Sequence, residues 1–284
     1  MEWQRILRRR RLARIGDLVL DDVTCVGGSA RWSPVEPDEG WAVVLVRAGA
    51  FRREADGRAA FLDPSRGYLS REGTEERFAF TAGGGQRCTV IGLTAELYDA
   101  HALAAASDWL LAPPTRFDLR HRSLLAATTR GVDGFEAAER VLRLLGSLGP
   151  APEAAASRRP ATREAHGRLV ASVQEALATE HLSAGLDELA ARVGASAHHL
   201  SRVFRQVTGR TLTDYRNELR VRRVLQDLSE GSSAGLSTLA AAYGFADQAH
   251  LCRVVKQYAG RTPSELRREL SMNLQAGATL GGRP

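Results

Sequence analysis

The stretch GFADQAHLCRVVKQYAGRTPSELRREL, residues 244–270, decides the fold of the C-terminal region, because a similar stretch precedes it. Residues 194–219 read GASAHHLSRVFRQVTGRTLTDYRNEL. The opening glycines Gly194 and Gly244 are 50 residues apart, whereas the aligned Leu200 and Leu251 are 51 apart. The second copy therefore carries one extra residue, which we place in a turn. Inside a helix it would rotate the following side chains to another face.

Both copies have the apolar spacing i, i+3, i+4, i+7 of an amphipathic helix. The apolar positions are Leu200, Val203, Phe204 and Val207 in the first copy and Leu251, Val254, Val255 and Tyr258 in the second. Each of these helices follows a shorter apolar segment, residues 186–194 and 236–244, that ends in a glycine. A terminal glycine is typical of a left-handed helix C-cap. This order is the helix-turn-helix pattern: a short helix, a tight turn and a second helix with a polar outer face.

The segment between the copies, residues 213–231, predicts a connecting helix with Thr213 as its N-cap and Gly231 at its end. Such a helix would span roughly 25 Å. A rigid connector of this size would hold two recognition helices near successive major-groove faces, which lie about 34 Å apart along B-DNA.

On these residues the chain resembles the AraC/XylS family of bacterial transcriptional regulators over residues 164–270. Leu251, Cys252 and Val255 stand where the family usually has Phe, Ser and Phe, and Leu266 replaces a Tyr. These changes make the apolar core smaller and keep its pattern.

The resemblance implies that both recognition helices enter adjacent major grooves of promoter DNA. The implied base contacts are His198, Ser201 and Arg202 in the first helix and Gln248, Ala249, His250, Cys252 and Arg253 in the second. Arginine bonds guanine bidentately, and glutamine pairs with adenine. The implied phosphate contacts are Arg205, Arg210, Thr211, Lys256, Arg261 and Thr262. Phosphate contacts position a protein without reading sequence, and the two threonines are also expected to cap the helices that follow them.

The chain as a whole is predicted to be α+β with two domains. Residues 1–148 are expected to form a cupin-like effector-binding and dimerisation domain, because residues 40–93 read as short strands with frequent turn signals. Helices are expected over residues 95–112, 119–131 and 135–148. A Pro- and Ala-rich stretch, residues 149–163, reads as a linker. It precedes the DNA-binding domain, residues 164–271, and a flexible tail, residues 272–284.

The N-terminal half is expected to bind a small-molecule effector. The candidate lining is Trp41, Phe51, Tyr68, Phe78 and Phe80, with Arg47 or Arg71 as an anchor for an anion. An alternative is a thiol or metal response through Cys25 and Cys88. A metal-dependent cupin enzyme is not expected, because none of the seven histidines falls within residues 40–93 and such sites use histidine ligands. No cofactor, metal or catalytic residue is therefore predicted.

The remaining expectations concern partners and location. A stripe over Phe135, Ala138, Val141, Leu142 and Leu145 fits either a homodimer interface or packing within the monomer. RNA polymerase is an expected partner, and the alternative class is an architectural DNA-binding protein that lacks an effector. The arginine run 8–11 reads as a disordered tail or as a nonspecific DNA contact. Three widely spaced cysteines and no apolar run of membrane-spanning length favour the cytoplasm over a membrane. The net charge of +6 weakly favours an anionic partner.

Overall fold

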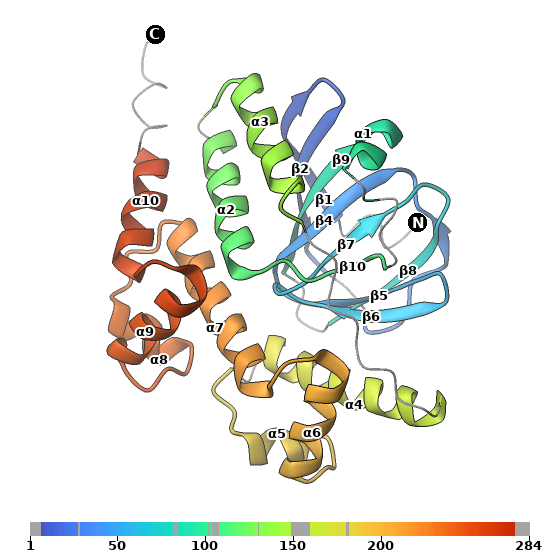
Figure 1. Ribbon diagram of the computed structural model, residues 1–284, viewed down its shortest axis with the longest axis vertical. Coiled ribbons are helices and arrows are strands. Elements are labelled where there is room, and N and C mark those ends of the chain that lie inside the picture. Colours follow the sequence, from blue (N-terminus) through green and yellow to red (C-terminus); the bar gives the residue numbers. More distant parts are fainter. Residues whose placement is uncertain are drawn as a thin grey trace.

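The computed structural model describes residues 7–27, 29–81, 85–101, 103, 108–129, 131–148, 160–179 and 182–275. It has a β-rich N-terminal half and a helical C-terminal half, which lie side by side (Figure 1). This arrangement confirms the predicted α+β class with two differently built halves. Among the described residues, no helix is both long and apolar enough to cross a membrane.

Two antiparallel sheets build the N-terminal half. The first has the order β1 (Leu7–Ile15), β2 (Leu18–Cys25), β9 (Gln86–Leu93), β4 (Trp41–Ala48), β7 (Gly67–Ser70) and β10 (Leu110–Leu111). The second has the order β3 (Glu36–Pro37), β8 (Glu75–Phe80), β5 (Phe51–Ala55) and β6 (Arg58–Leu62). The sheets enclose a cavity between them, so the expected cupin-like β-barrel is confirmed.

The strand β1 overturns one expectation. Arg8 to Arg11 pair in register with residues 21–24 of β2 and are therefore not a disordered tail. Side chains alternate along the strand, so Arg9 and Arg11 contact Asp21 on the cavity side, and Arg10 contacts Asp22 on the outer side. The two aspartates supply the charge that allows an arginine-rich segment to form an edge strand.

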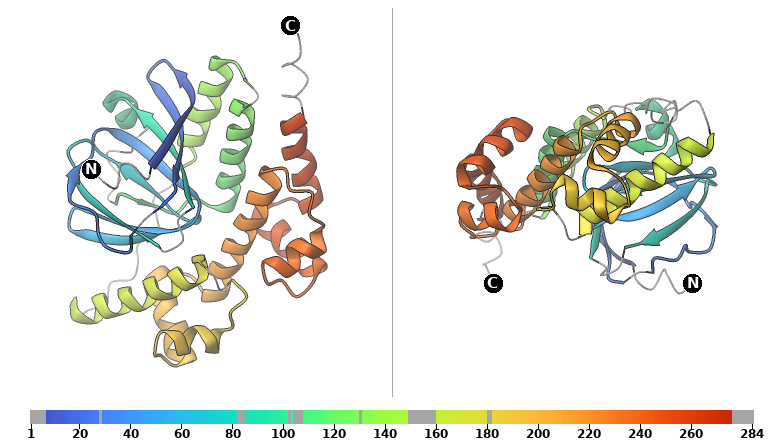
Figure 2. Two further views of the ribbon diagram at one scale, coloured as in Figure 1. Left: turned by 180° about the vertical axis from the view of Figure 1, so that it is seen from behind. Right: turned by 90° about the horizontal axis from the view of Figure 1, so that it is seen from below.

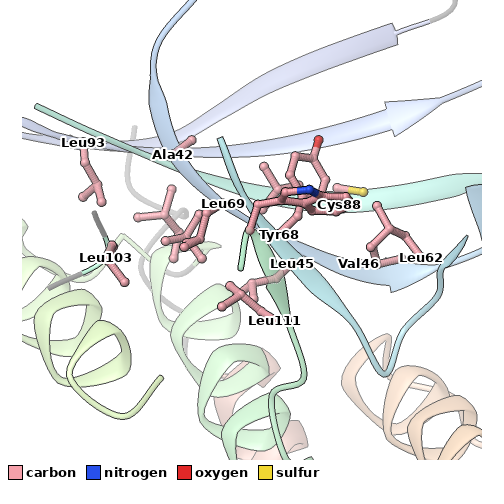
Figure 3. Close-up of a cluster of buried hydrophobic side chains, with 14 of the residues drawn as sticks. Ala42, Leu45, Val46, Leu62, Tyr68, Leu69, Cys88, Leu93, Leu103 and Leu111 are labelled. Carbon is pink, nitrogen blue, oxygen red and sulfur yellow. The ribbon is translucent and has the colours of Figure 1, made fainter. Parts of the chain in front are cut away.

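Helices cover the outer face of the larger sheet. Helix α1 (Ala95–Ala100) follows β9, and α2 (Thr115–Thr129) and α3 (Gly134–Leu145) pack on the sheet. Figure 3 shows Leu45 and Leu111 on the helix side of the sheet and the ring of Tyr68 on the other. The expected helix 95–112 is wrong in its second part. Leu110 and Leu111 instead extend the sheet as β10 beside β7. Without β10, the outer backbone N–H and C=O groups of β7 would be unpaired.

Seven helices follow in the described C-terminal residues: α4 (Pro160–Thr179), α5 (Leu186–Arg192), α6 (Ala197–Thr208), α7 (Leu212–Ser229), α8 (Leu236–Ala242), α9 (Gln248–Ala259) and α10 (Pro263–Gln275). Helix α4 begins inside the expected linker, and residues 149–159 of that linker lie outside the described residues. Helix α10 extends into the expected tail as far as Gln275, and the rest of the tail also lies outside them.

The helical half contains two hydrophobic cores joined by α7. The first is built from α4, α5, α6 and the start of α7, around Phe204 and Tyr215. The second is built from the rest of α7 with α8, α9 and α10, around Leu225 and Val255. Leu119 of α2 belongs to this second core, so the N-terminal half contributes to the interior of the second helix-turn-helix unit. Figure 2 shows α7 running between the two units, with α2 beside it.

A buried polar network fastens α7 to the N-terminal half. The Tyr215 hydroxyl donates a hydrogen bond to Asp63 in the loop after β6. Arg222 donates to the Pro113 carbonyl at 2.5 Å and to Glu218 at 2.6 Å. On α2, Arg122 donates to Asp118 at 2.9 Å and also contacts Gln226 of α7. Buried charges are tolerated only where they are paired. Both ion pairs lie within one helix, and the bonds to Asp63, Pro113 and Gln226 cross the interface.

Candidate nucleic-acid interface

The two helix-turn-helix turns differ by one residue. Gly194 and Gly244 both have positive φ, +63° and +70°, as expected for glycines that end helices. In the first copy Ser196 caps α6 and accepts a hydrogen bond from the backbone N–H of His199 at 3.2 Å. In the second copy Asp247 caps α9, so two residues, Phe245 and Ala246, separate the glycine from the cap, whereas in the first copy only Ala195 does. The extra residue lies in the turn, and the prediction is confirmed.

Helix α6 buries its apolar face and exposes its polar one. Leu200, Val203 and Phe204 are fully buried in the first core. The predicted DNA-contacting side chains of this helix are all exposed: His198, Ser201, Arg202 and Arg205. One terminal nitrogen of Arg202 lies 3.4 Å from Nδ1 of His199, and no carboxylate of the described residues pairs with it. Its guanidinium therefore remains available to a ligand.

Helix α9 follows the same plan. Leu251 and Val255 are fully buried, and the exposed residues on the other face are Gln248, Ala249, Arg253 and Lys256. His250 is half-buried, and its Nδ1 accepts a hydrogen bond from the Ala246 backbone N–H at 3.2 Å. This bond leaves Nε2 as the ring nitrogen available for another contact. Cys252 is also half-buried, which leaves its thiol at the edge of the exposed face.

The electrostatics of both faces favour a polyanion. Neither α6 nor α9 contains an aspartate or glutamate within its bounds. Their exposed cations therefore have no carboxylate neighbour on the same helix. The faces remain exposed while the N-terminal half is docked on α7, so the docked arrangement leaves the predicted DNA-contacting side chains uncovered.

The predicted phosphate contacts fall into different environments. Arg210 pairs with the buried Glu218 and lies 5.9 Å from the centre of the Tyr215 ring, whereas Arg261 pairs with Glu269. Thr211 accepts a hydrogen bond from Asp214 N–H at 3.1 Å and is the N-cap of α7. Thr262 and Glu265 exchange hydrogen bonds in a capping box. The expected capping by both threonines is confirmed, and Thr213 as N-cap is wrong, because α7 begins at Leu212.

The barrel encloses a cavity of about 580 Å³. All five candidate lining residues line it: Trp41, Phe51, Tyr68, Phe78 and Phe80. Neither Arg47 nor Arg71 is among its lining residues. Side chains alternate along β4, so Ala42 and Val44 face the cavity and Arg47 points outward, where it contacts Asp22 and donates to the Cys88 carbonyl at 3.2 Å.

Cys25 and Cys88 line the same cavity from neighbouring strands, and both are free thiols. Burial raises the pKa of Cys88 to about 12 and also raises the pKa of Cys25, whose thiol donates to the Gly27 carbonyl at 2.5 Å. Both thiols are therefore protonated near neutral pH, and the reactive or metal-binding form is the thiolate. Among the described residues, no group of three or more His, Cys, Asp or Glu side chains is placed to hold a metal ion. The structure thus gives the thiol and metal alternative little support.

The sequence interpretation missed the interface between the two halves. Glu218 and Arg222 are one helical turn apart on α7, and both are buried. Their spacing was visible in the sequence as an i, i+4 pair of opposite charges. Such a pair is usual on a solvated helix face, so nothing in the sequence indicated that Asp118 of α2 lies 3.8 Å from Arg222.

Comparison with known proteins adds independent findings. A helix-turn-helix domain family matches residues 189–269, which contain both recognition helices. The chain is 32% identical over 87 residues to the probable transcription factor PqrA of Proteus vulgaris, covering 31% of this chain and 70% of that protein. It is 26% identical over 88 residues to the Msm operon regulatory protein of Streptococcus mutans, and the match spans 31% of the length of each.

A solved structure is also similar to part of the chain. A transcriptional regulator from Chromobacterium violaceum, described as having an AraC-type DNA-binding domain, is 28% identical over 38% of this chain and 89% of its own, with a TM-score of 0.29. The curated relatives are named as a transcription factor and an operon regulator. With its two capped helix-turn-helix units and their acid-free exposed faces, the chain belongs to the AraC/XylS family and is a DNA-binding transcriptional regulator.

Proposed function

We propose that α6 and α9 read two adjacent major-groove segments of one promoter site. The observation that carries this proposal is the matched construction of the two helices. Each buries the same apolar positions, and each exposes arginine and other hydrogen-bonding groups without a carboxylate. The exposed residues differ between the copies, which suits the reading of two different DNA sequences.

The side chains divide into two roles. We assign base contacts to His198, Ser201 and Arg202 and to Gln248, Ala249, His250, Cys252 and Arg253. We assign phosphate contacts to Arg205, Arg210, Thr211, Lys256, Arg261 and Thr262. Arg205 and Lys256 are exposed and have no carboxylate partner within the described part of the chain, whereas Arg210 and Arg261 must exchange or share one to bind phosphate.

Selection of bound fragments from genomic DNA, followed by a gel-shift titration, tests the assignment. Arg253→Ala should weaken specific binding by about 1–3 kcal/mol and relax preference at one base pair. Arg31→Ala is the matched control, because Arg31 is an exposed arginine of the N-terminal half and belongs to neither helix. Unchanged specific binding by the Arg253 variant would remove α9 from the reading role. A steep salt dependence without sequence preference would favour the architectural alternative.

The N-terminal half, residues 1–148, is proposed to bind a small-molecule effector in the barrel cavity. Trp41, Phe51, Tyr68 and Phe78 support this, because an aromatic-lined cavity of this size is typical of ligand sites. The strand β4 lines the cavity with Val44 on one side and contacts α7 on the other. A ligand that moved this wall would therefore act on the helix that joins the two DNA-reading units. A gel shift with and without ligand tests this link.

A second copy of the chain is the proposed dimer partner, bound through α3. Phe135 is 82% exposed and Leu142 is 37% exposed, and they lie two helical turns apart. Between and beside them, Glu139 and Arg143 are also exposed. In an antiparallel pair of α3 helices the acidic first half of one would face the basic second half of the other, as a two-fold interface requires.

The remaining assignments follow from promoter binding. RNA polymerase is the proposed further partner, because a regulator at a promoter acts on the enzyme that transcribes from it. The cytoplasm, where bacterial promoter DNA lies, is the proposed location. We retain residues 164–271 as the DNA-binding domain, with its connection to the N-terminal half in residues 149–163 and a C-terminal tail over residues 272–284.

A further inference from the structure

The polar groups of the barrel cavity are mostly acceptors. Of the described residues, six carboxylate side chains line it, from Asp17, Asp21, Glu36, Asp38, Glu39 and Glu76, and only two arginines do. Both arginines, Arg9 and Arg11, already contact Asp21, and they are 61% and 46% exposed at the rim. An anionic ligand would meet more carboxylates than cations on this wall.

Arg53 lies deep in the described part of the barrel and is already paired with a carboxylate. Arg53 has no exposed surface, and its Nε donates to Glu76 at 2.7 Å. Its guanidinium lies 4.4 Å from the centre of the Tyr68 ring and 4.6 Å from that of Trp109. Its two terminal nitrogens are buried without a hydrogen-bond partner. Arg53 therefore balances the charge of Glu76 from outside the cavity lining and leaves the carboxylate on the cavity side.

A second acceptor stands at the other end of the cavity. Gln86 is only 2% exposed, and its amide nitrogen donates to the Ala50 carbonyl at 3.1 Å and to the Thr81 hydroxyl at 3.2 Å. A backbone carbonyl can only accept, so this contact fixes which end of the amide is nitrogen. Among the described residues the amide oxygen then has no partner, although a buried acceptor normally has one. A ligand that donates a hydrogen bond would satisfy this oxygen.

Aromatic rings connect the two ends. Phe51 lies 5.8 Å from Phe80, 6.1 Å from Phe78 and 6.4 Å from Tyr68, measured between ring centres. All four rings line the cavity. Along β8 the side chains of Glu76, Phe78 and Phe80 face inward in turn, so a span of about 13 Å separates the first from the last.

We infer that the effector of this regulator is an organic cation: a protonated or quaternary amine on an apolar, preferably aromatic, body. The charged group would lie by Glu76 and Asp38, the body against the four rings, and a second donor would suit the Gln86 oxygen. Aromatic faces attract organic cations as well as apolar groups, so both parts of such a ligand are matched. The inference rests on the proposed effector role of the barrel and replaces the anion anchor expected at Arg47 or Arg71.

Thermal-shift measurements and calorimetry on the full chain test this with four aromatic probes. Three of them differ mainly in charge: cationic 2-phenylethylammonium, neutral 2-phenylethanol and anionic 3-phenylpropionate. The fourth is the quaternary cation benzyltrimethylammonium. The cations should bind at least tenfold tighter than the neutral and anionic probes. Glu76→Gln and Asp38→Asn should each reduce cation affinity at least fivefold and leave the neutral probe unchanged. Glu75→Gln is the control, because Glu75 neighbours Glu76 but is exposed and does not line the cavity.

The outcomes separate the ligand class from the effector role. Tighter binding of the anion or the neutral probe, or cation binding unaffected by both variants, overturns the inferred class and leaves the barrel as a ligand site. Cation binding with the predicted variant effects, but without any change in promoter binding, supports the class and counts against the effector role. If none of the four probes binds the folded chain at millimolar concentration, the inferred class is wrong. Circular dichroism of both variants establishes that they fold.

Discussion

The hydroxyl of Tyr215 donates a hydrogen bond to the carboxylate of Asp63 across the boundary between the two halves of the chain. Asp63 is fully buried, and its other oxygen accepts from the Ser65 backbone N–H at 2.7 Å and from the Ser65 hydroxyl at 2.6 Å. Tyr215 sits in the first turn of α7, next to the core of the first helix-turn-helix unit. The contact thus ties a loop of the barrel to the base of one DNA-reading unit.

Tyr215→Phe should lower the free energy of unfolding by about 1–3 kcal/mol, because it leaves a buried carboxylate oxygen without its donor. Denaturant unfolding of the full chain measures this. Tyr258→Phe is the control: its hydroxyl donates to the Asp214 carbonyl at 3.1 Å, within the helical half and near solvent. A loss for Tyr258→Phe as large as for Tyr215→Phe would contradict a special role for the contact between the halves.

The two kinds of DNA contact should be separable by salt. Lys256→Ala should weaken binding to all sequences equally and reduce the slope of log affinity against log salt by about 1, because one released counterion is lost. Arg253→Ala should instead weaken the cognate site more than random DNA. Titrations at several salt concentrations with both DNAs measure the difference. If Lys256→Ala discriminated between sequences, its assignment to phosphate would be wrong.

Stability should fall in acid. Burial lowers the pKa of His121, so the neutral ring contributes to the free energy of unfolding above its ordinary pKa of about 6.5. This contribution is lost as the pH falls below that value. Burial alone would raise the pKa of Asp118, but Arg122, His121 and Arg222 lower it below the ordinary value of about 4. Its contribution is therefore present above pH 4 and is lost below it.

Thermal denaturation between pH 8 and pH 3 should show both steps. Asp118→Asn should be less stable at pH 7 and should have a smaller step below pH 4, because the carboxylate that titrates there is gone. Asp17→Asn is the control, since Asp17 is exposed in the turn between β1 and β2. A melting temperature that stays constant from pH 7 to pH 3 would contradict this account of the interface.

Two residues of α3 should have opposite effects. Phe135→Ser should shift the chain from dimer to monomer with little change in stability, because its side chain is 82% exposed in the monomer. Leu145→Ala should cost about 2–5 kcal/mol, because Leu145 is 2% exposed in the barrel core. Sedimentation and denaturant unfolding measure the two effects. A Phe135 variant that sediments as the wild type would remove α3 from the proposed interface.

The paired glycines of the turns provide a matched comparison. An alanine at position 194 would meet no atom within 4 Å, so only its left-handed backbone is unfavourable, by about 1–2 kcal/mol. At position 244 the added Cβ would lie 2.9 Å from the Ser183 Cα. Gly244→Ala should therefore lose more stability than Gly194→Ala in denaturant unfolding. Equal losses would mean that the second turn has more room than the structure gives it.

The sequence by itself determined the helix-turn-helix units, because their evidence is local. The apolar spacing of α6 and α9, the glycines of the turns and the one-residue insertion are all visible within 30 residues. Helix periodicity and cap chemistry act over one or two turns, so they can be read without knowing the rest of the fold. The strands of residues 40–93 were predicted for the same reason, from alternation and turns.

Only the tertiary structure decided the rest, because it depends on contacts between distant residues. The arginine run became β1 because Asp21 and Asp22 lie on the adjacent strand. Leu110 and Leu111 became a strand because β7 presented an open edge, although their apolar run also suits a helix. The outward face of Arg47, the acceptors around the cavity and the docking of α7 on α2 follow from strand register and packing. A single-residue shift of register exchanges the two faces of a strand, and composition alone does not specify that choice.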